Sequence, residues 1–208
     1  MNYFQIGNLS APTVWIAAVS ALLIASILNR VFTGKKTSDW FWNGFFLYFL
    51  IWKLSYIVFH LKMFLDMPLS IVYFNGGLNG HIMGLVVLSV YLVMFAFKKS
   101  PSIYKESYRL FLLYFMCYEV IMNALEKNYI EALGHLVILV SFLFYLLYSK
   151  KNENLVSGRV FILFFLIDLL MISVFQTIVS IEVLTFIWIG LTIFILSKKI
   201  SKEARSIE

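Results

Sequence analysis

Ionisable side chains interrupt several apolar runs of this 208-residue chain, and their types serve acid–base chemistry and ligand binding. Inside a membrane span such a group costs on the order of a few kcal/mol, so each is expected to face the protein interior and find a partner. A histidine supplies a base near neutral pH, and a lysine supplies a compact positive charge. We therefore expect a polar site assembled from separate helices. Its candidates are Lys53, His81, Glu119, Glu131, His135, Asp168 and Glu182.

A glycine-containing stretch, FLDMPLSIVYFNGGLNGHIMG, lies just before one of these groups. Pro68 to Phe74 is expected to form an outer loop or a re-entrant segment. Gly76 and Gly77 allow a sharp backbone turn or a close approach to a ligand. Irregular backbone at membrane depth needs protein or water to satisfy it, so a cavity is expected beside it. The side chains expected to line that cavity are Asn75, Asn79 and His81.

The elements that position these residues are transmembrane helices. With 62% hydrophobic and 13% charged residues, the chain has too little polar surface for a soluble domain. Because about 20 apolar residues cross a bilayer, the sequence predicts an all-α protein, one bundle of seven spans over residues 1–208. The predicted spans are Thr13–Leu28, Trp40–Phe59, Leu78–Phe97, Leu110–Leu125, Ile130–Ser149, Val160–Val179 and Ile181–Ser197.

The ends of the chain and its cysteine content add two expectations. The N-terminal segment lacks the pattern of a cleaved signal, so the first span is expected to be a retained helix. Cys117 is the single cysteine and lies in an apolar run, which argues against a disulfide framework or a zinc site. We therefore expect no metal and no cofactor.

The distribution of basic residues predicts the orientation of the chain in the membrane. Of the 17 Lys and Arg residues, all except Lys53, Lys62 and Lys127 fall in the tail or in the connections after spans one, three and five. The positive-inside rule then places the N-terminus outside and the C-terminus in the cytoplasm. The basic residues lie in short juxtamembrane connections rather than on a folded face, so nucleic-acid binding is not expected.

The depth of the polar groups is asymmetric. With a helical rise of about 1.5 Å per residue, all of the candidate groups except Asp168 fall in the outer half of the membrane. Asp168 falls near the middle, and the cytoplasmic half has almost none. A transport path would require groups across both halves, so the asymmetry favours a site that opens toward the outer leaflet.

Each candidate also has a structural interpretation. Lys53 can extend its amine to the membrane surface or pair with Glu119. His135 can simply hydrogen-bond two helices. Glu131 and Glu182 can begin helices, where a carboxylate stabilises the positive end of the helix dipole.

Two motifs in the first half of the chain are similar to a known pattern. IGNLS, from Ile6, is similar to Ile-Gly-Pro-Leu, and SDWFWNGFFLYFLIWKLSYIVF has a Ser-Asp start and an ending similar to Arg-Leu-Gly-Tyr-Val-Leu-Phe. In this alignment Lys53 stands at the arginine and Tyr56 at the tyrosine.

Three later motifs continue the pattern. MPLSIVYFNGGLNGHIMG is similar to Asp-Pro-Leu followed by Trp-x-Gly-Gly-Met-Ser-Phe-His-Gly-Gly, with Gly76 and Gly77 at the first glycine pair and His81 at the histidine. NYIEALGHLVIL is similar to Gln-Leu-Tyr-Glu-Ala-Leu, with Glu131 at the glutamate, and SIEVLTFIWIGL is similar to Gly-Gln-Leu-Leu-Ser-Leu-Pro-Met. In this order the motifs resemble the prolipoprotein diacylglyceryl transferase family. These seven-span bacterial enzymes move a diacylglyceryl group from phosphatidylglycerol to a lipoprotein cysteine.

The chain departs from the family at its signature. Where the family has Gly-Arg-x-Gly-Asn-Phe-x-Asn and a following glutamate, this chain has CYEVIMNALEKNY, with Asn123 and Glu126 but no arginine. The Arg-Phe-x-x-Glu pattern of span six is also missing. A lysine cannot replace the bidentate fork that arginines give a phosphate.

The resemblance implies a mechanism and a location. His81 would act as the base for the substrate thiol, and Lys53 would contact the departing glycerol phosphate. The implied substrate-binding residues are Gly76, Gly77, Asn79, Tyr56, Asn123 and Glu131. Implied partners are phosphatidylglycerol or another phospholipid and a prolipoprotein or secreted peptide, at the outer leaflet of a bacterial plasma membrane.

Two hypotheses follow, and whether the chain is an enzyme stays open between them. The first is a divergent transferase acting on phospholipid or lipoprotein. The second is a non-catalytic relative that binds a lipid, lipoprotein or secreted peptide and supports a partner protein. Small-solute transport is a third, weaker alternative, because paired repeats and discontinuous helices are not evident.

Overall fold

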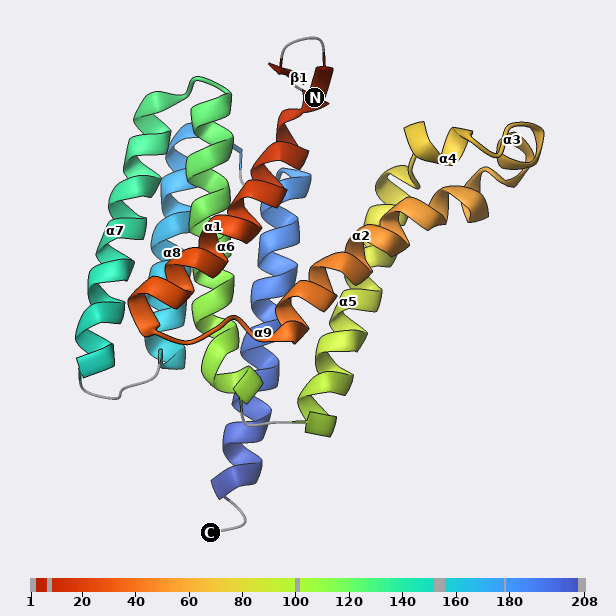
Figure 1. Cartoon of the computed structure of the whole chain (residues 1–208). Helices are drawn as coiled ribbons and strands as arrows, with labels where there is room; N and C mark the ends of the chain where they lie inside the picture. Colours follow the sequence, from red (N-terminus) through yellow and green to blue (C-terminus); the bar gives the residue numbers. More distant parts are fainter. Residues whose placement is uncertain (1–2, 7–8, 100–101, 152–155, 178, 206–208) are drawn as a thin grey trace.

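The computed structural model describes residues 3–6, 9–99, 102–151, 156–177 and 179–205, and these are almost entirely helical (Figure 1). A short antiparallel hairpin precedes the helices, with Tyr3 opposite Pro12 and Ile6 opposite Leu9. The elements are β1 (Tyr3–Ile6), β2 (Leu9–Pro12), α1 (Thr13–Thr33), α2 (Asp39–Phe59), α3 (Leu61–Asp66), α4 (Ser70–Tyr73), α5 (Gly77–Lys99), α6 (Ser102–Leu125), α7 (Tyr129–Lys151), α8 (Gly158–Phe175) and α9 (Ile181–Arg205).

Local sequence explains where several helices begin and end. α1 stops at Gly34, which has a left-handed φ of 74° and donates its N–H to the Arg30 carbonyl. α2 carries Asp39 in its first turn, at the positive end of the helix dipole. The hydroxyl of Ser157 accepts the Val160 N–H at the start of α8. The helix boundaries lie within a few residues of the predicted spans, except that α6 begins at Ser102 rather than Leu110 and α9 ends at Arg205 rather than Ser197.

Six of the described helices are long and apolar enough to cross a membrane, which supports an all-α, multi-pass membrane protein. They are Thr13–Thr33, Asp39–Phe59, Gly77–Ala96, Glu106–Leu125, Tyr129–Ser149 and Gly158–Phe175. The apolar part of α9, Ile181–Ser197, is shorter. The seventh span therefore stays a prediction.

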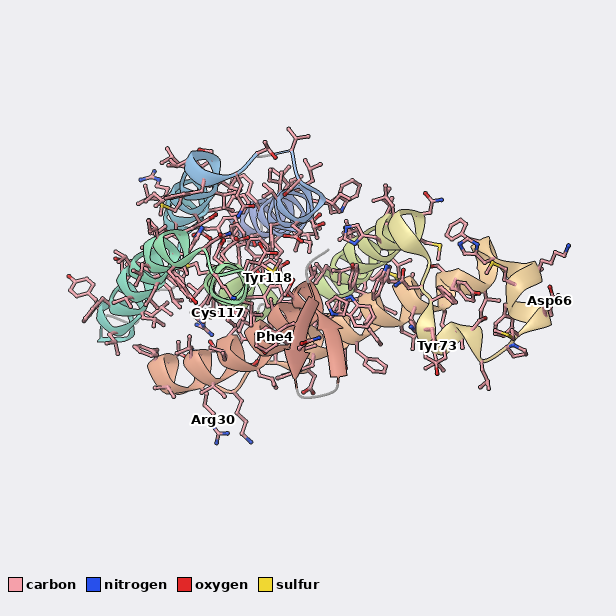
Figure 2. All side chains as sticks on the ribbon, turned by 90° about the horizontal axis from the view of Figure 1, so that it is seen from above. Phe4, Arg30, Asp66, Tyr73, Cys117 and Tyr118 are labelled. Atoms are coloured by element: carbon pink, nitrogen blue, oxygen red, sulfur yellow. The ribbon has the colours of Figure 1, made fainter. Side chains whose placement is uncertain are left out.

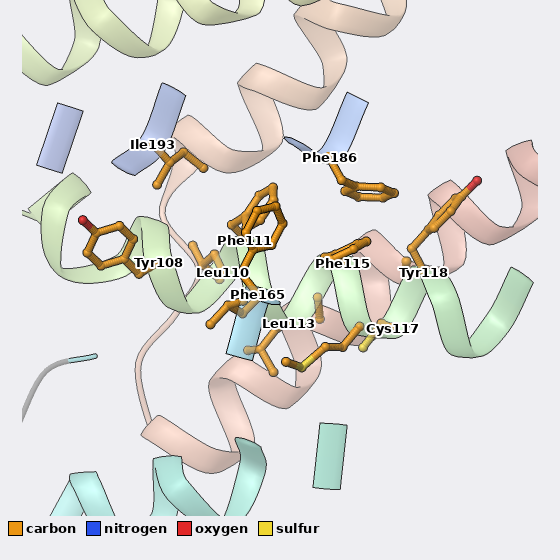
Figure 3. Close-up of a cluster of buried hydrophobic side chains, with 14 of the residues drawn as sticks. Tyr108, Leu110, Phe111, Leu113, Phe115, Cys117, Tyr118, Phe165, Phe186 and Ile193 are labelled. Atoms are coloured by element: carbon orange, nitrogen blue, oxygen red, sulfur yellow. The ribbon is translucent and has the colours of Figure 1, made fainter. Parts of the chain in front are cut away.

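Helix α6 is the centre of the bundle and packs against α1, α7, α8 and α9. Its aromatic side chains form the core shown in Figure 3. Phe115 lies with its ring centroid 4.3 Å from that of Phe186 on α9, and Phe111 lies 5.7 Å from Phe165 on α8. Cys117 is buried in the same core as a free thiol, in agreement with a packing role.

Helices α2 and α5 form an arm that packs on the bundle through α5 and α9. Figures 1 and 2 show the arm extending away from the other helices toward α3 and α4 at its tip, where Asp66 and Tyr73 lie. The segment from Pro68 to Phe74, expected to be an outer loop or a re-entrant segment, contains the short helix α4, and most of its side chains are exposed.

The helix ends separate into two groups along the bundle (Figure 1). The hairpin, the arm tip, the turn between α6 and α7 and the start of α9 lie at one end. The end of α1, the starts of α2, α6 and α8, and the ends of α5, α7 and α9 lie at the opposite end. The basic connections identified in the sequence all belong to this second group.

Arg109 corrects the expectation that this second end has almost no buried polar groups. The helix α6 begins at Ser102 rather than at Leu110, so Arg109 lies within it and is 6% exposed. Its Nε donates to Asn29 Oδ1 of α1 at 2.7 Å. From hydropathy, the first predicted span ends just before Asn29 and the fourth begins just after Arg109. Because these two residues hydrogen-bond to each other, both helices continue past them.

Candidate functional site

Besides the pair of Arg109 and Asn29, two clusters of hydrogen-bonded polar side chains lie among the described helices. The first, which we call the acidic site, contains Glu119 and Asn123 of α6, Glu131 and His135 of α7, Asp168 of α8 and Gln176 just after α8. The second, the His81 bridge, contains Tyr48 of α2, His81 of α5 and Thr185 of α9. Figure 2 shows the α6 residue Tyr118, next to Glu119, within the main bundle and well away from the arm tip.

Helical spacing assembles the acidic site. Glu119 and Asn123 are four residues apart on α6, and Glu131 and His135 are four residues apart on α7. Residues at this spacing share one face of a helix, so each pair projects in one direction. The third helix, α8, supplies Asp168 opposite α7. All five side chains are buried.

His135 and Asp168 form the tightest contact in the acidic site. His135 Nδ1 lies 2.7 Å from Asp168 Oδ1, and both residues are 0% exposed. His135 Nε2 lies 4.0 Å from Glu131 Oε1, which is too far for a hydrogen bond. Within the described part of the chain, His135 Nε2 and Asp168 Oδ2 have no hydrogen-bond partner. If Asp168 accepts the Nδ1 proton, Nε2 carries a free lone pair.

Gln176 closes the acidic site at its edge. It follows the last residue of α8, and its side chain is exposed at one side. Its Nε2 donates to Glu131 Oε1 at 2.9 Å and to Asn123 Oδ1 at 3.4 Å. Asn123 Nδ2 in turn donates to the Glu119 carbonyl at 3.0 Å. One amide from the α8 end therefore links α6 and α7.

The site has an excess of carboxylates. Glu119 lies within electrostatic range of Asp168, Glu182 and Glu131, and Glu182 hydrogen-bonds to Tyr118. In the ranges that the structure describes, Glu131 and Asp168 lie within 4.0 Å of His135, and no lysine or arginine forms an ion pair with any of the four carboxylates. The arrangement favours a cationic or proton-donating ligand and disfavours an anionic one. Over the same ranges, no group of three or more metal-ligating side chains is arranged to hold a metal ion.

The His81 bridge ties the arm to the bundle. Tyr48 Oη lies 2.6 Å from His81 Nδ1, and His81 Nε2 lies 2.8 Å from Thr185 Oγ1. Thr185 donates its own proton to the Ile181 carbonyl at 2.6 Å, so it accepts from Nε2–H of His81. Nδ1 then accepts from the Tyr48 hydroxyl. Both ring nitrogens are occupied, so the expected role of His81 as a base requires one of these bonds to open.

The other predicted residues of the arm hold its tip in place. Lys53 Nζ donates to the Val72 carbonyl at 2.9 Å, and the Tyr56 hydroxyl donates to Ser70 Oγ at 3.0 Å. Gly77 has a φ of 60° and donates its N–H to Asn75 Oδ1. Asn79 is exposed. Among the described residues, no hydrogen bond or ion pair joins Lys53 to His81 or to Glu119.

Gly76 is a helix-packing residue rather than part of an open cavity. Its N–H donates to the Trp52 carbonyl of α2 at 3.1 Å. A Cβ atom on Gly76 would lie 1.9 Å from Ser55 Oγ, and one on Gly80 would lie 2.1 Å from the same atom. The small residues allow α2 and α5 to approach closely, as in small-xxx-small packing between membrane helices.

The structure thus divides the residues predicted from the sequence. Asn123 and Glu131 meet through Gln176, whereas His81 and Lys53 belong to the arm. Sequence reasoning missed Gln176, because it treated the residue as part of a span, and it missed Tyr48 and Thr185 among many similar residues. The only local signal was the placement of a glutamine within an apolar segment.

Replacing Tyr48 by phenylalanine is expected to lower the free energy of unfolding by about 1–3 kcal/mol, because His81 Nδ1 loses its donor in a largely apolar setting. Thermal unfolding in detergent measures the change. Tyr73→Phe is the control, since Tyr73 is 79% exposed at the arm tip. Equal stability of the two variants would contradict a bridging role for His81.

Comparison of the chain with protein-family models, with curated proteins and with solved structures gives no match. The motif resemblance to the prolipoprotein diacylglyceryl transferases therefore stays a hypothesis.

Proposed function

We propose that this chain is a non-catalytic, multi-pass membrane protein that binds a secreted or lipid-anchored peptide at the acidic site and presents it to a partner protein. The observation that carries this proposal is the set of buried carboxylates from α6, α7 and α8 without a lysine or arginine ion pair in the described ranges. Such a site matches a peptide with a positive charge, and it repels the phosphate of phosphatidylglycerol.

The proposed orientation puts the acidic site near the outer leaflet of a bacterial plasma membrane. The turn between α6 and α7 and the start of α9 lie at the same end as the N-terminal hairpin, opposite the basic connections (Figure 1). The positive-inside rule supports placing this end outside. A secreted peptide would then reach the site without crossing the membrane.

The binding of a basic peptide tests this function. We expect a fluorescent, palmitoylated peptide rich in lysine to bind the full chain in nanodiscs at least tenfold more tightly than a glutamate-rich counterpart. Glu131→Gln should weaken binding of the basic peptide, whereas Asp66→Asn, which removes an exposed carboxylate at the arm tip, should not. Equal affinity for the two peptides would reject the proposal.

One observation favours the transferase as a second candidate. His135 Nε2 is unbonded and the ring is oriented by Asp168, which is the arrangement of a general base and its orienting carboxylate. The nucleophile would then be the thiol of the substrate. We expect the chain to insert normally but fail to restore prolipoprotein lipidation in a strain depleted of its own transferase. In the described part of the chain, no lysine or arginine pairs with the acidic site, where it could hold the leaving phosphate. Restored lipidation that is lost with His135→Gln would favour catalysis.

A further inference from the structure

We infer that the chemical group taken by the acidic site is a primary ammonium, bound between His135 Nε2 and Glu131. This inference deepens the proposed function, because it names the part of the peptide that is recognised. It rests on unsatisfied hydrogen-bonding atoms, on the charge of the site and on the position of Gln176.

Among the described residues, His135 Nε2 and Asp168 Oδ2 lack a hydrogen-bond partner. Donation of the Nδ1 proton to Asp168 leaves Nε2 as an acceptor, and the facing atom of Glu131 is also an acceptor. Their separation of 4.0 Å is too long for a direct bond but suits one donor nitrogen that bonds to both. His135 is completely buried, and its Nε2 has no partner in the described ranges. An unsatisfied acceptor at this depth is costly unless a ligand completes it.

The charge of the site selects the kind of donor. Glu131 and Asp168 are buried on either side of His135, and a positively charged donor stabilises the ionised form of both carboxylates, which a neutral donor does not. A metal ion fits poorly, because the described residues offer no suitable ligand cluster. A quaternary ammonium has charge but no N–H group. A primary ammonium supplies one positive charge and three N–H donors.

Gln176 already occupies part of the proposed position. Its amide N–H donates to Glu131 Oε1 and Asn123 Oδ1, although the residue is exposed and lies beyond the end of α8. An incoming ammonium can take over these acceptors while the Gln176 side chain turns toward solvent. The amide of Gln176 thus acts as a displaceable substitute for the ligand.

Octylamine tests the inference on the full chain in nanodiscs of phosphatidylglycerol, which contains no amine. We expect octylamine at neutral pH to shift the ¹⁵N resonance of His135 Nε2 and to raise the thermal midpoint, whereas octyltrimethylammonium and octanol leave both unchanged. Glu131→Gln should weaken octylamine binding at least tenfold, and Asp66→Asn should leave it unchanged. Equal responses to the two cations, or an Nε2 resonance that no amine shifts, would overturn the inference.

Gln176→Ala keeps the test decisive if Glu131→Gln fails to fold. Removal of the competing amide should strengthen octylamine binding several-fold, an effect that a purely structural role of Gln176 does not predict. Unchanged or weaker binding by this variant would contradict the displacement.

Three further binding experiments distinguish the possible sources of the ammonium, and they test the ammonium separately from the proposed function. A basic peptide with its amines free should bind, and the same peptide with every amine acetylated should not. Phosphatidylethanolamine in the nanodisc should not displace octylamine, whereas displacement would assign the site to a lipid headgroup and reject the peptide. A peptide that binds equally with and without its amines would support the proposed function but reject the ammonium.

Discussion

An Asp168→Ala variant is expected to lose about 3–5 kcal/mol of unfolding free energy, the largest loss among single substitutions in the acidic site. Removal of one partner from a buried, hydrogen-bonded pair leaves the other partner polar and unsatisfied. Here His135 would keep an Nδ1–H group that no other described residue accepts, in a position with 0% exposure. Unfolding of the purified chain, followed by circular dichroism during titration with a denaturing detergent, measures the loss.

Three comparisons separate this loss from a general effect of charge removal. Asp168→Asn retains an acceptor oxygen at the same place and should lose about 1–2 kcal/mol, the ordinary range for weakening one hydrogen bond. Asp66→Ala removes an exposed carboxylate from the arm tip and should be nearly neutral. The pair Asp168→Leu and His135→Phe should be more stable together than Asp168→Ala alone, because apolar side chains replace both partners. Similar stabilities for Asp168→Ala and Asp66→Ala would show that the buried contact does not hold α7 to α8.

The course of the helices could be predicted from the sequence because it depends on the length of apolar runs. The runs from Trp40 to Phe59 and from Ile130 to Ser149 match α2 and α7 within two residues at each end. The start of α6 could not be found in this way. A charged residue ends a hydropathy window whether or not it has a partner, and Asn29, the partner of Arg109, is distant in sequence.

The acidic site was predicted in part for a similar reason. Depth along each helix, which is a local property, placed all the candidate groups except Asp168 in the outer half of the membrane, and Glu119, Glu131 and His135 are among them. The rotation of each helix decides which of these side chains meet, and that depends on packing between helices. Rotation brings Asp168 onto His135 and turns His81 toward Tyr48 and Thr185. The glycines show the same limit, since their sequence is equally suited to a ligand pocket and to close helix packing.

A Gly80→Ala variant is expected to lose about 1–3 kcal/mol of unfolding free energy by separating α2 from α5. The new Cβ would lie 2.1 Å from Ser55 Oγ, 3.2 Å from the Trp52 carbonyl oxygen and 3.3 Å from Ser55 Cβ. The worst overlap is thus with one hydroxyl, and the other contacts are only slightly short. Detergent unfolding with the arm tip labelled by a fluorophore, at a cysteine introduced in place of Tyr73 after Cys117→Ala, would report arm release separately from bundle unfolding.

The Ser55 hydroxyl makes this overlap testable by a double-mutant cycle. Ser55→Ala should recover most of the loss in Gly80→Ala, because it removes the atom at 2.1 Å. The same change should not rescue Gly76→Ala, whose Cβ would still lie 2.9 Å from both the residue 55 Cβ and the Gly80 Cα. Gly134→Ala is the matched control, since its Cβ meets the flexible end of Met171, which can move aside. Rescue of Gly76→Ala would mean that the contact between α2 and α5 is looser than the glycine spacing implies. Failure to rescue Gly80→Ala would mean that the Ser55 hydroxyl is not the source of its lost stability.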